Sequence, residues 1–267
     1  MSGQERPPGP FLRNVRADQL LVERGLAASR SQAARLIAGG LRWRVGAADA
    51  AWRQVAKNGD DVPEAAELEL ADTAEARYVS RGGLKLEGAL HASGVSAQGR
   101  RCLDVGQSTG GFTDCLLQQG AARVVGVDVG HGQLHPKLRG DKRVLAVEKV
   151  NARALVPHDL VAAGDSGEPF DLVVGDLSFI SLTLVLPALA PLLAPQGELL
   201  MLVKPQFELQ PGQVGKGGIV RDSTLYAQVE QRIRQACAQL GLRVDGWHDS
   251  AIAGGDGNRE FFVHAAR

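Results

Sequence analysis

The residues from 103 to 114 combine a carboxylate with a glycine-rich turn. They read Leu-Asp-Val-Gly-Gln-Ser-Thr-Gly-Gly-Phe-Thr-Asp, and an apolar segment further on ends at Asp128, 24 residues after Asp104. Glycines between a strand and a helix let the backbone approach a ligand, and an acid after the next strand can hydrogen-bond ribose hydroxyls. The spacing predicts a nucleotide-type cofactor site. A turn that serves only the architecture is the alternative.

The position of Asp104 favours one type of cofactor. The spacing is not G-x-G-x-x-G, and a carboxylate just before the glycines would repel a pyrophosphate. The same carboxylate suits the ammonium group of S-adenosylmethionine, or a water bound to it. We therefore expect S-adenosylmethionine rather than a dinucleotide. The predicted cofactor-binding residues are Asp104, Gly106, Ser108, Thr109, Gly110, Gly111, Phe112, Asp128 and Asp176.

The next two apolar segments indicate which atom accepts a methyl group. Asp176 follows the segment 171–175, but the two prolines typical of amino-group methyltransferases do not follow it. A carbon methyltransferase needs a thiolate, and no cysteine lies in these segments. Oxygen is therefore the favoured acceptor. Further charged residues stand at element ends, namely Lys204, Glu260 and Lys85; each alone could be a solvated edge residue.

From Arg101 onward, strands and helices alternate, which predicts a parallel sheet covered on both faces. The last two strands are close in sequence and should be antiparallel. The predicted strands are 102–105, 124–128, 144–147, 172–175, 199–203, 242–247 and 260–264, and the predicted helices are 111–119, 182–193 and 222–240. Parallel strands bring their carboxyl ends, and the polar residues there, to one edge of the sheet.

The preceding part predicts a small α-α-β domain. Its helices should span 17–24 and 31–38, the second with Ser29 as N-cap, and its strands 41–45 and 67–70. From Phe11 to Lys57 there are nine basic residues and three acids, whereas the stretch 58–75 holds seven acids and no base. Such a basic face is typical of a polyanion-binding domain.

Composition excludes several classes of protein. The 267 residues carry 30 basic and 30 acidic side chains, so the chain is neither globally basic nor an acidic disordered protein. Three cysteines are too few for a disulfide framework or a zinc cluster, and the glycines around His131 and His135 argue against a metal site. No targeting or membrane-spanning segment is visible. We expect a cytoplasmic protein with no metal and no membrane partner.

The motifs Asp-Val-Gly-x-Ser-Thr-Gly-Gly-Phe-Thr-Asp and Asp-Leu-Ser-Phe-Ile-Ser resemble the hemolysin-A/TlyA family of ribosomal RNA 2′-O-methyltransferases, whose catalytic domain is FtsJ-like. The resemblance covers nearly the whole chain after about Asn14. Two departures stand out. Gln107 replaces a small residue and is expected to point out of the loop, and residues 43–49 lack a Val-Asn-Gly turn.

The resemblance implies a Rossmann-like S-adenosylmethionine-dependent methyltransferase sheet with a small N-terminal α+β domain of the αL type that binds RNA. The expected boundaries are a flexible tail at 1–13, the RNA-binding domain at 14–75 and the methyltransferase domain at 76–267. The resemblance also implies a catalytic tetrad of Lys85, Asp176, Lys204 and Glu260. The predicted RNA-binding residues are Arg16, Arg30, Arg35, Arg42, Arg44 and Arg81.

Lys204 is then the candidate that receives or orients the proton of a ribose hydroxyl, with Lys85 beside it and the two acids holding the lysines. The substrate would be a cytidine in ribosomal RNA, free or in a ribosomal subunit. Two other functions stay open: a ribosome-assembly factor with a non-catalytic cofactor domain, and a hemolysin. Loss of a tetrad residue would favour the first, and a spanning helix or barrel pattern would favour the second.

Overall fold

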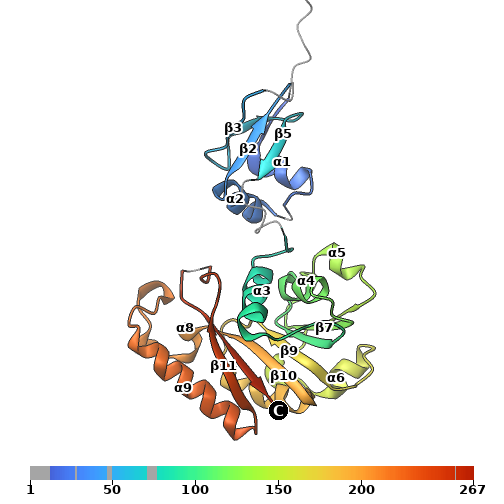
Figure 1. Ribbon diagram of the computed structural model, residues 1–267, viewed down its shortest axis with the longest axis vertical. Helices are drawn as coiled ribbons and strands as arrows, with labels where there is room; N and C mark the ends of the chain where they lie inside the picture. The colour runs from blue at the N-terminus through green and yellow to red at the C-terminus, as the bar shows by residue number, and fades with distance from the viewer. Residues whose placement is uncertain (1–12, 28, 47–49, 71–76, 256) are drawn as a thin grey trace, which may run out of the picture. The chain divides into compact units, whose positions relative to one another are not determined.

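The computed structural model describes residues 13–27, 29–46, 50–70, 77–255 and 257–267. The chain divides into two compact units, Met1–Arg77 and Tyr78–Arg267, both visible in Figure 1. Residues 1–12 of the expected tail lie outside the described part. So do residues 47–49 of the departing loop and residues 71–76, where the expected domain boundary falls.

The N-terminal unit packs two helices, α1 (Ala17–Glu23) and α2 (Arg30–Ala38), around buried apolar side chains such as Leu21 and Leu41. The predicted N-cap of α2 is confirmed, because the Ser29 hydroxyl accepts a hydrogen bond from the Gln32 N–H at 3.2 Å. The helix ends at Gly39, as predicted.

Short antiparallel strands complete this unit. One sheet has the order β3-β2-β5, and β1 pairs with β4 in a second sheet. The bounds are β1 Asn14–Arg16, β2 Leu41–Arg44, β3 Arg53–Gln54, β4 Asp61–Pro63 and β5 Glu67–Leu70. The strands β1, β3 and β4 were not predicted, because two or three residues are too few to show a period of two.

The second unit is built on a seven-stranded sheet of order β11-β12-β10-β9-β6-β7-β8. The strands from β6 to β10 run parallel, and β12 is antiparallel to both of its neighbours, which confirms the predicted antiparallel pair. The bounds are β6 Arg101–Val105, β7 Arg123–Asp128, β8 Val144–Glu148, β9 Phe170–Gly175, β10 Leu193–Val203, β11 Arg243–Asp249 and β12 Phe261–Ala266.

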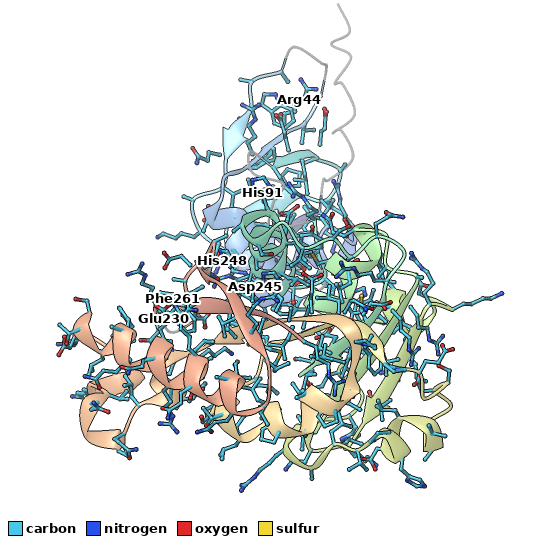
Figure 2. All side chains as sticks on the ribbon, turned by 60° about the horizontal axis from the view of Figure 1, so that its bottom comes forward. Arg44, His91, Glu230, Asp245, His248 and Phe261 are labelled. Carbon is cyan, nitrogen blue, oxygen red and sulfur yellow. The ribbon has the colours of Figure 1, made fainter. Side chains whose placement is uncertain are left out.

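Alternate residues of these strands pack on opposite faces of the sheet, as the apolar runs require. On one face Cys102 and Leu172 join the side chains of α3, α4 and α5; on the other, Leu103 and Val173 join those of α6, α7 and α9. Tyr226 of α9 meets Phe261, labelled in Figure 2, with ring centroids 5.3 Å apart. The helix bounds are α3 Gly82–Ser93, α4 Gly111–Gln118, α5 Pro136–Arg139, α6 Pro157–Ala162, α7 Leu186–Leu189, α8 Pro205–Glu208 and α9 Thr224–Gln239.

The prediction of one helix over 182–193 was wrong. The segment holds a 3₁₀ turn (η3, Leu182–Leu184), the single-turn helix α7 and a second 3₁₀ turn (η4, Ala190–Leu192). Pro187 and Pro191 explain the breaks, because proline has no N–H to donate and is tolerated only in the first turn of a helix. Leu193 already belongs to β10.

The strand order reverses at β6, where β7 lies on one side and β9 on the other. In such sheets ligands bind beyond the carboxyl ends of the strands at this point. The glycine turn, Asp128, Asp176 and Lys204 all follow strands that end at this edge. Across the described residues, no helix is both long and apolar enough to span a membrane.

Candidate active site

The glycine turn leaves β6 in a conformation that brings its backbone against the end of β9. Gly106 has a φ of +84°, and a Cβ there would stand 2.6 Å from the carbonyl oxygen of Asp176. A side chain at this position is therefore excluded both by conformation and by space. The turn and the end of β9 form one wall of a cavity.

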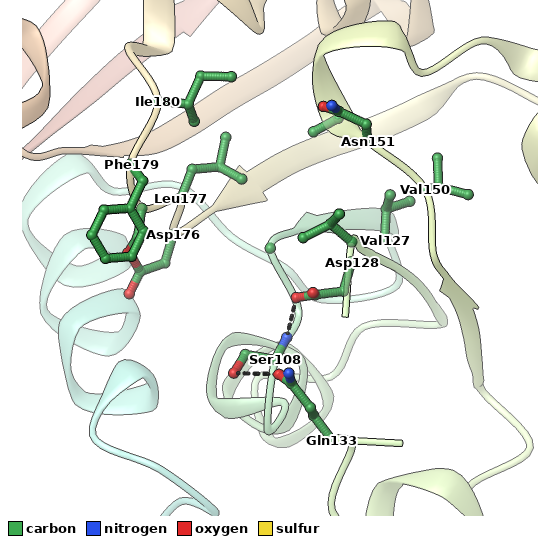
Figure 3. A pocket seen from close by; sticks show the side chains of 14 residues that line it. Ser108, Val127, Asp128, Gln133, Val150, Asn151, Asp176, Leu177, Phe179 and Ile180 are labelled. Atoms are coloured by element: carbon green, nitrogen blue, oxygen red, sulfur yellow. Dashed lines mark hydrogen bonds between the residues drawn. The ribbon is translucent and has the colours of Figure 1, made fainter. Parts of the chain in front are cut away.

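Asp128 is held at the opposite side of this cavity, whose volume is about 440 Å³. Its two carboxylate oxygens accept hydrogen bonds from the N–H groups of Ser108 and Gly130, both at 2.7 Å. Figure 3 shows Asp128 with Ser108 and Gln133 facing the side that carries Asp176 and Phe179. Each oxygen keeps acceptor capacity, so the carboxylate can still bind ribose hydroxyls.

A second cavity of about 200 Å³ continues from the first. It shares Gly106, Ser108 and Asp176 with the larger cavity and reaches Lys204. Of the remaining predicted cofactor-binding residues, Thr109, Gly111 and Phe112 line it. Gly110 lines neither cavity; a Cβ there would lie 2.3 Å from Leu138, so this glycine serves packing against α5.

Asp104 lies under the turn and is 1% exposed. Its Oδ2 accepts a hydrogen bond from the Thr113 hydroxyl at 2.7 Å, while its Oδ1 is buried with no hydrogen-bond partner among the described residues. Burial raises the pKa of Asp104 to about 7, and the hydrogen bond from Thr113 opposes that rise. Asp104 lines neither of the two cavities, so its role toward the ammonium group of S-adenosylmethionine stays a prediction.

Gln107 does not point out of the loop, so that prediction was wrong. Its side chain turns inward, is 5% exposed and donates a hydrogen bond from Nε2 to the Thr113 hydroxyl at 2.9 Å. The space comes from Gly126 on β7, where a Cβ would stand 2.0 Å from the Gln107 amide. Left-handed backbone at Gly106 and at Ser108 directs the intervening side chain under the turn.

The four residues of the expected tetrad lie in one chain of contacts. Lys204 Nζ is 2.5 Å from Asp176 Oδ1, Asp176 Oδ2 is 3.9 Å from Lys85 Nζ, and Lys85 Nζ is 2.5 Å from Glu260 Oε2. Lys85 and Glu260 are 7% and 3% exposed. The register explains the assembly: Val203 pairs with Phe261 across antiparallel strands, so Lys204 and Glu260 emerge at the same end.

Three further residues of this region were missed from the sequence. The Ser178 hydroxyl accepts a hydrogen bond from Lys204 Nζ at 2.8 Å. Phe179 is 90% exposed, has a φ of +64° and lies 5.2 Å from the Phe207 ring. Both residues belong to the quoted motif Asp-Leu-Ser-Phe-Ile-Ser, so the sequence did hold a signal for them.

The third missed residue, Glu208 at the end of α8, hydrogen-bonds the segment that follows Asp176. Its carboxylate accepts hydrogen bonds from the Ser181 hydroxyl and the Leu182 N–H, both at 2.6 Å. Burial raises the pKa of Glu208. The carboxylate thereby fixes the segment that follows Asp176 to the helix that follows Lys204.

An open cavity of about 400 Å³ lies on the far side of the lysines. Lys85, Lys204 and Glu260 line it together with the two phenylalanine rings and with Gly217 and Gly218. Ser178 and Phe179 also line the Asp128 cavity. The charged chain therefore stands between a cavity suited to a cofactor and a cavity open to a second ligand.

In the N-terminal unit, four of the predicted RNA-binding arginines contact acids. Arg16 and Arg30 both hydrogen-bond Asp18, and these contacts, that of Arg16 foremost, lower the pKa of Asp18 to about 2. Arg42 and Arg44 pair with Glu69 and Glu67 across β5, at 2.6 and 2.7 Å.

Arg42 and Arg44 also share one face of β2, where both guanidinium groups lie over the Trp52 ring, at 5.2 and 4.5 Å from its centroid. Arg35 lies on α2. Arg81 belongs to the second unit, where it donates a hydrogen bond to the Ala253 carbonyl oxygen. Among the described residues, no group of three His, Cys, Asp or Glu side chains could hold a metal ion.

Known proteins are similar to this chain in sequence and in fold. Residues 78–267 match the FtsJ-like methyltransferase family. The chain is 45% identical to the 16S/23S rRNA (cytidine-2′-O)-methyltransferase TlyA of Mycobacterium tuberculosis, over 94% of this chain and 89% of that protein. It is 36% identical to hemolysin A of Brachyspira hyodysenteriae, over 94% and 99% of the two chains.

Solved structures have the same fold. A Streptococcus thermophilus protein with a provisional hemolysin name is 40% identical and superposes with a TM-score of 0.71, over 96% of this chain and 89% of that one. A Listeria monocytogenes protein provisionally named an S-adenosylmethionine-dependent methyltransferase is 13% identical, with a TM-score of 0.50 over 68% and 99% of the chains. The predicted fold, a methyltransferase sheet with a small N-terminal α+β unit, is confirmed.

Proposed function

The chain belongs to the TlyA/hemolysin-A family of rRNA 2′-O-methyltransferases with an FtsJ-like domain. We propose that it methylates the ribose 2′-hydroxyl of a cytidine in ribosomal RNA. The methyl donor is S-adenosylmethionine. The reaction takes place in the cytoplasm, on ribosomal RNA that is free or assembled in a subunit.

The donor's binding is assigned to the Asp128 cavity and the glycine turn. Asp128, which lines that cavity, would accept hydrogen bonds from the ribose hydroxyls. Bound there, S-adenosylmethionine supplies an electrophilic methyl group on a sulfonium. The turn would hold that group next to the continuing cavity, which Asp176 and Lys204 line.

The tetrad acts on the acceptor oxygen. A ribose hydroxyl is a weak nucleophile until its proton can leave, and in-line attack requires that the oxygen be held in place. Lys204, 2.5 Å from Asp176 and 2.8 Å from Ser178, receives or orients that proton. Lys85 steers the hydroxyl, while Asp176 and Glu260 hold the two lysines.

The single observation that carries this proposal is the contact chain Lys204-Asp176-Lys85-Glu260 between the two cavities. The test maps 2′-O-methylation in ribosomal RNA from cells with the gene, without it, and with the gene restored. We expect one or a few cytidines to lose the modification without the gene and to regain it with the restored gene. An unchanged map would reject the enzyme and favour a non-catalytic assembly factor.

Phe179 offers a face for the target base. Its ring is 90% exposed at the junction of the Asp128 cavity and the open cavity. Stacking of a base on an aromatic ring contributes about 1–3 kcal/mol. We therefore expect Phe179→Ala to raise the KM for RNA by roughly 5- to 150-fold, measured in steady-state methyl transfer. Phe179→Trp should retain most of the activity, and cofactor affinity should stay unchanged in both; a normal KM in the alanine variant would rule the stacking out.

The N-terminal unit supplies RNA affinity through Arg42 and Arg44. Each phosphate contact adds about 0.7–0.9 to the slope of log affinity against log salt. Arg42→Gln/Arg44→Gln should therefore lower that slope by about 1.4–1.8, measured by RNA binding at several salt concentrations. The control is Arg53→Gln, because exposed Arg53 stacks on Trp43, on the other face of the sheet. Equal slopes for the double variant and the wild type would make Arg42 and Arg44 a solvated face only.

A further inference from the structure

Two short segments that leave neighbouring strands contact each other through their side chains. Residues 176–182 follow β9, and residues 204–208 follow β10, the parallel neighbour of β9. Three contacts join the segments in the same order along both, namely Lys204 with Ser178, Phe207 with Phe179, and Glu208 with Ser181. Residues 204–208 therefore hold the loop after β9 at three points.

Phe179 lies in the middle of that loop in a conformation that costs free energy. Its φ of +64° falls in the left-handed region, which a residue with a bulky side chain rarely adopts. The residue is also 90% exposed, so burial of its ring does not offset the cost. Such a conformation persists where the surrounding structure holds it, and it is typical of functional sites. The residues on either side of Phe179 must therefore be fixed.

Glu208 fixes the side that follows Phe179. Its carboxylate belongs to a residue that is 4% exposed, and it accepts hydrogen bonds from the Ser181 hydroxyl and the Leu182 N–H, both at 2.6 Å. Arg232 of α9 in turn donates to the backbone carbonyl oxygen of Glu208 at 2.7 Å. Through these bonds the loop is attached to α9, whose apolar side packs against the sheet.

We propose that Glu208 is a positioning residue for RNA: through two hydrogen bonds to the loop, its carboxylate holds the exposed Phe179 ring where the target base stacks. The inference rests on the proposed function, because it assumes that the junction of the two cavities receives a nucleotide. Phe179 lines both cavities and is labelled in Figure 3, whereas Glu208 lines neither. Glu208 therefore acts on RNA through the loop and not by contact.

Glu208→Ala removes both hydrogen bonds and should raise the KM for RNA by roughly 5-fold or more. Without these bonds the loop relaxes to an ordinary negative φ, and the ring leaves its place. The kcat should stay close to that of the wild type, because Lys204 and Asp176 keep their contact. The measurement is steady-state methyl transfer to ribosomal RNA by the full chain, with active sites counted by titration with S-adenosylhomocysteine. A purely structural role would lower the fraction of active protein and leave the KM unchanged.

Glu208→Gln keeps the shape of the side chain and should keep the KM of the wild type. The amide oxygen can accept from the Leu182 N–H, and the amide nitrogen can donate to the Ser181 hydroxyl. The hydroxyl proton can then turn to the Thr183 hydroxyl, 2.7 Å away. Ser181→Ala removes one of the two hydrogen bonds from the loop side. It should raise the KM by less than Glu208→Ala does, and it replaces that variant in the test if the latter does not fold.

Asp165→Ala is the matched control for loss of a buried carboxylate. Asp165 is 7% exposed, accepts a hydrogen bond from the Gly167 N–H at 3.0 Å and pairs with Arg101 at the start of β6. It lies at the amino ends of the parallel strands, opposite the site. The replacement should lower the Tm and leave the KM for RNA unchanged.

A double variant tests whether Glu208 acts through the ring. Phe179→Ala alone should already raise the KM, and adding Glu208→Ala should raise it no further, because no ring remains to be held. Additive rises would overturn the inference, since Glu208 would then act on another contact. An equal rise in Glu208→Gln and Glu208→Ala would also overturn it, by assigning the effect to the lost charge.

The remaining outcomes separate this inference from the proposed function. A normal KM in Glu208→Ala together with a raised KM in Phe179→Ala would overturn the role of Glu208 and leave the base-stacking role of Phe179 intact. Failure of the wild-type chain to methylate ribosomal RNA would overturn the proposed function, and the inference with it.

Discussion

Lys204→Ala is expected to lose about 10²–10⁴-fold or more of the methyl-transfer rate, and Lys204→Arg is expected to fail with it. Alanine removes the amine that we propose acts on the acceptor hydroxyl. Arginine keeps the positive charge beside Asp176 but cannot give up its proton near neutral pH. In the proposed role, Lys204 contributes mainly in the transition state. The loss should therefore appear in single-turnover rates, while the affinities for RNA and cofactor stay close to normal.

The control for this prediction is Lys142→Arg. Lys142 is exposed and precedes β8, at the amino ends of the parallel strands and so at the edge of the sheet opposite the site. Its replacement should leave the rate unchanged. If Lys204→Arg turned over normally, Lys204 would act as an electrostatic anchor, and the proton would leave through water instead.

Glu260→Leu should both inactivate and destabilise the protein. Lys85 is 7% exposed and its ammonium group lies 2.5 Å from Glu260. Removing one partner of a buried ion pair leaves the other uncompensated, at a cost of about 3–5 kcal/mol. For a unit of this size that lowers the Tm by about 6–20 °C, measured by thermal unfolding.

The double variant Lys85→Met/Glu260→Leu separates the two effects. Replacing a buried ion pair by apolar side chains of similar volume is often neutral or stabilising, so the Tm should return close to that of the wild type. Methyl transfer should stay absent, because neither the cation nor its acid remains. Activity in the stable double variant would show that the pair serves folding alone.

The sequence predicted where Asp176 and Lys204 lie, because both residues follow predicted strands. Asp176 and Lys204 terminate long apolar runs, and parallel runs end at one edge of a sheet. The tetrad roles of all four residues came from the family resemblance. The place of Glu260 beside the others depends on the insertion of β12 between β10 and β11, which puts the start of an antiparallel strand beside the ends of parallel ones.

The missed features depend on side-chain direction and on distant partners. The inward turn of Gln107 follows from left-handed backbone at Ser108, a non-glycine residue for which no local pattern announces that conformation. Glu208 binds the Ser181 hydroxyl, 27 positions earlier in the chain, and neither residue belongs to a periodic pattern that would pair them. The break in the helix at 182–193 could have been predicted from the sequence, since Pro187 and Pro191 cannot both lie inside a regular helix.

The alternation of charge along Lys204-Asp176-Lys85-Glu260 limits the electrostatic potential that the site projects into solution. With both lysines protonated, two cations and two anions cancel, and the potential of such a multipole decays more steeply with distance than that of a single charge. The tetrad should therefore exert little attraction on approaching polyanions, free phosphate or chloride. RNA binding then depends on other charged surfaces of the protein, so added salt should weaken it. The rate of methyl transfer within the formed complex should stay constant.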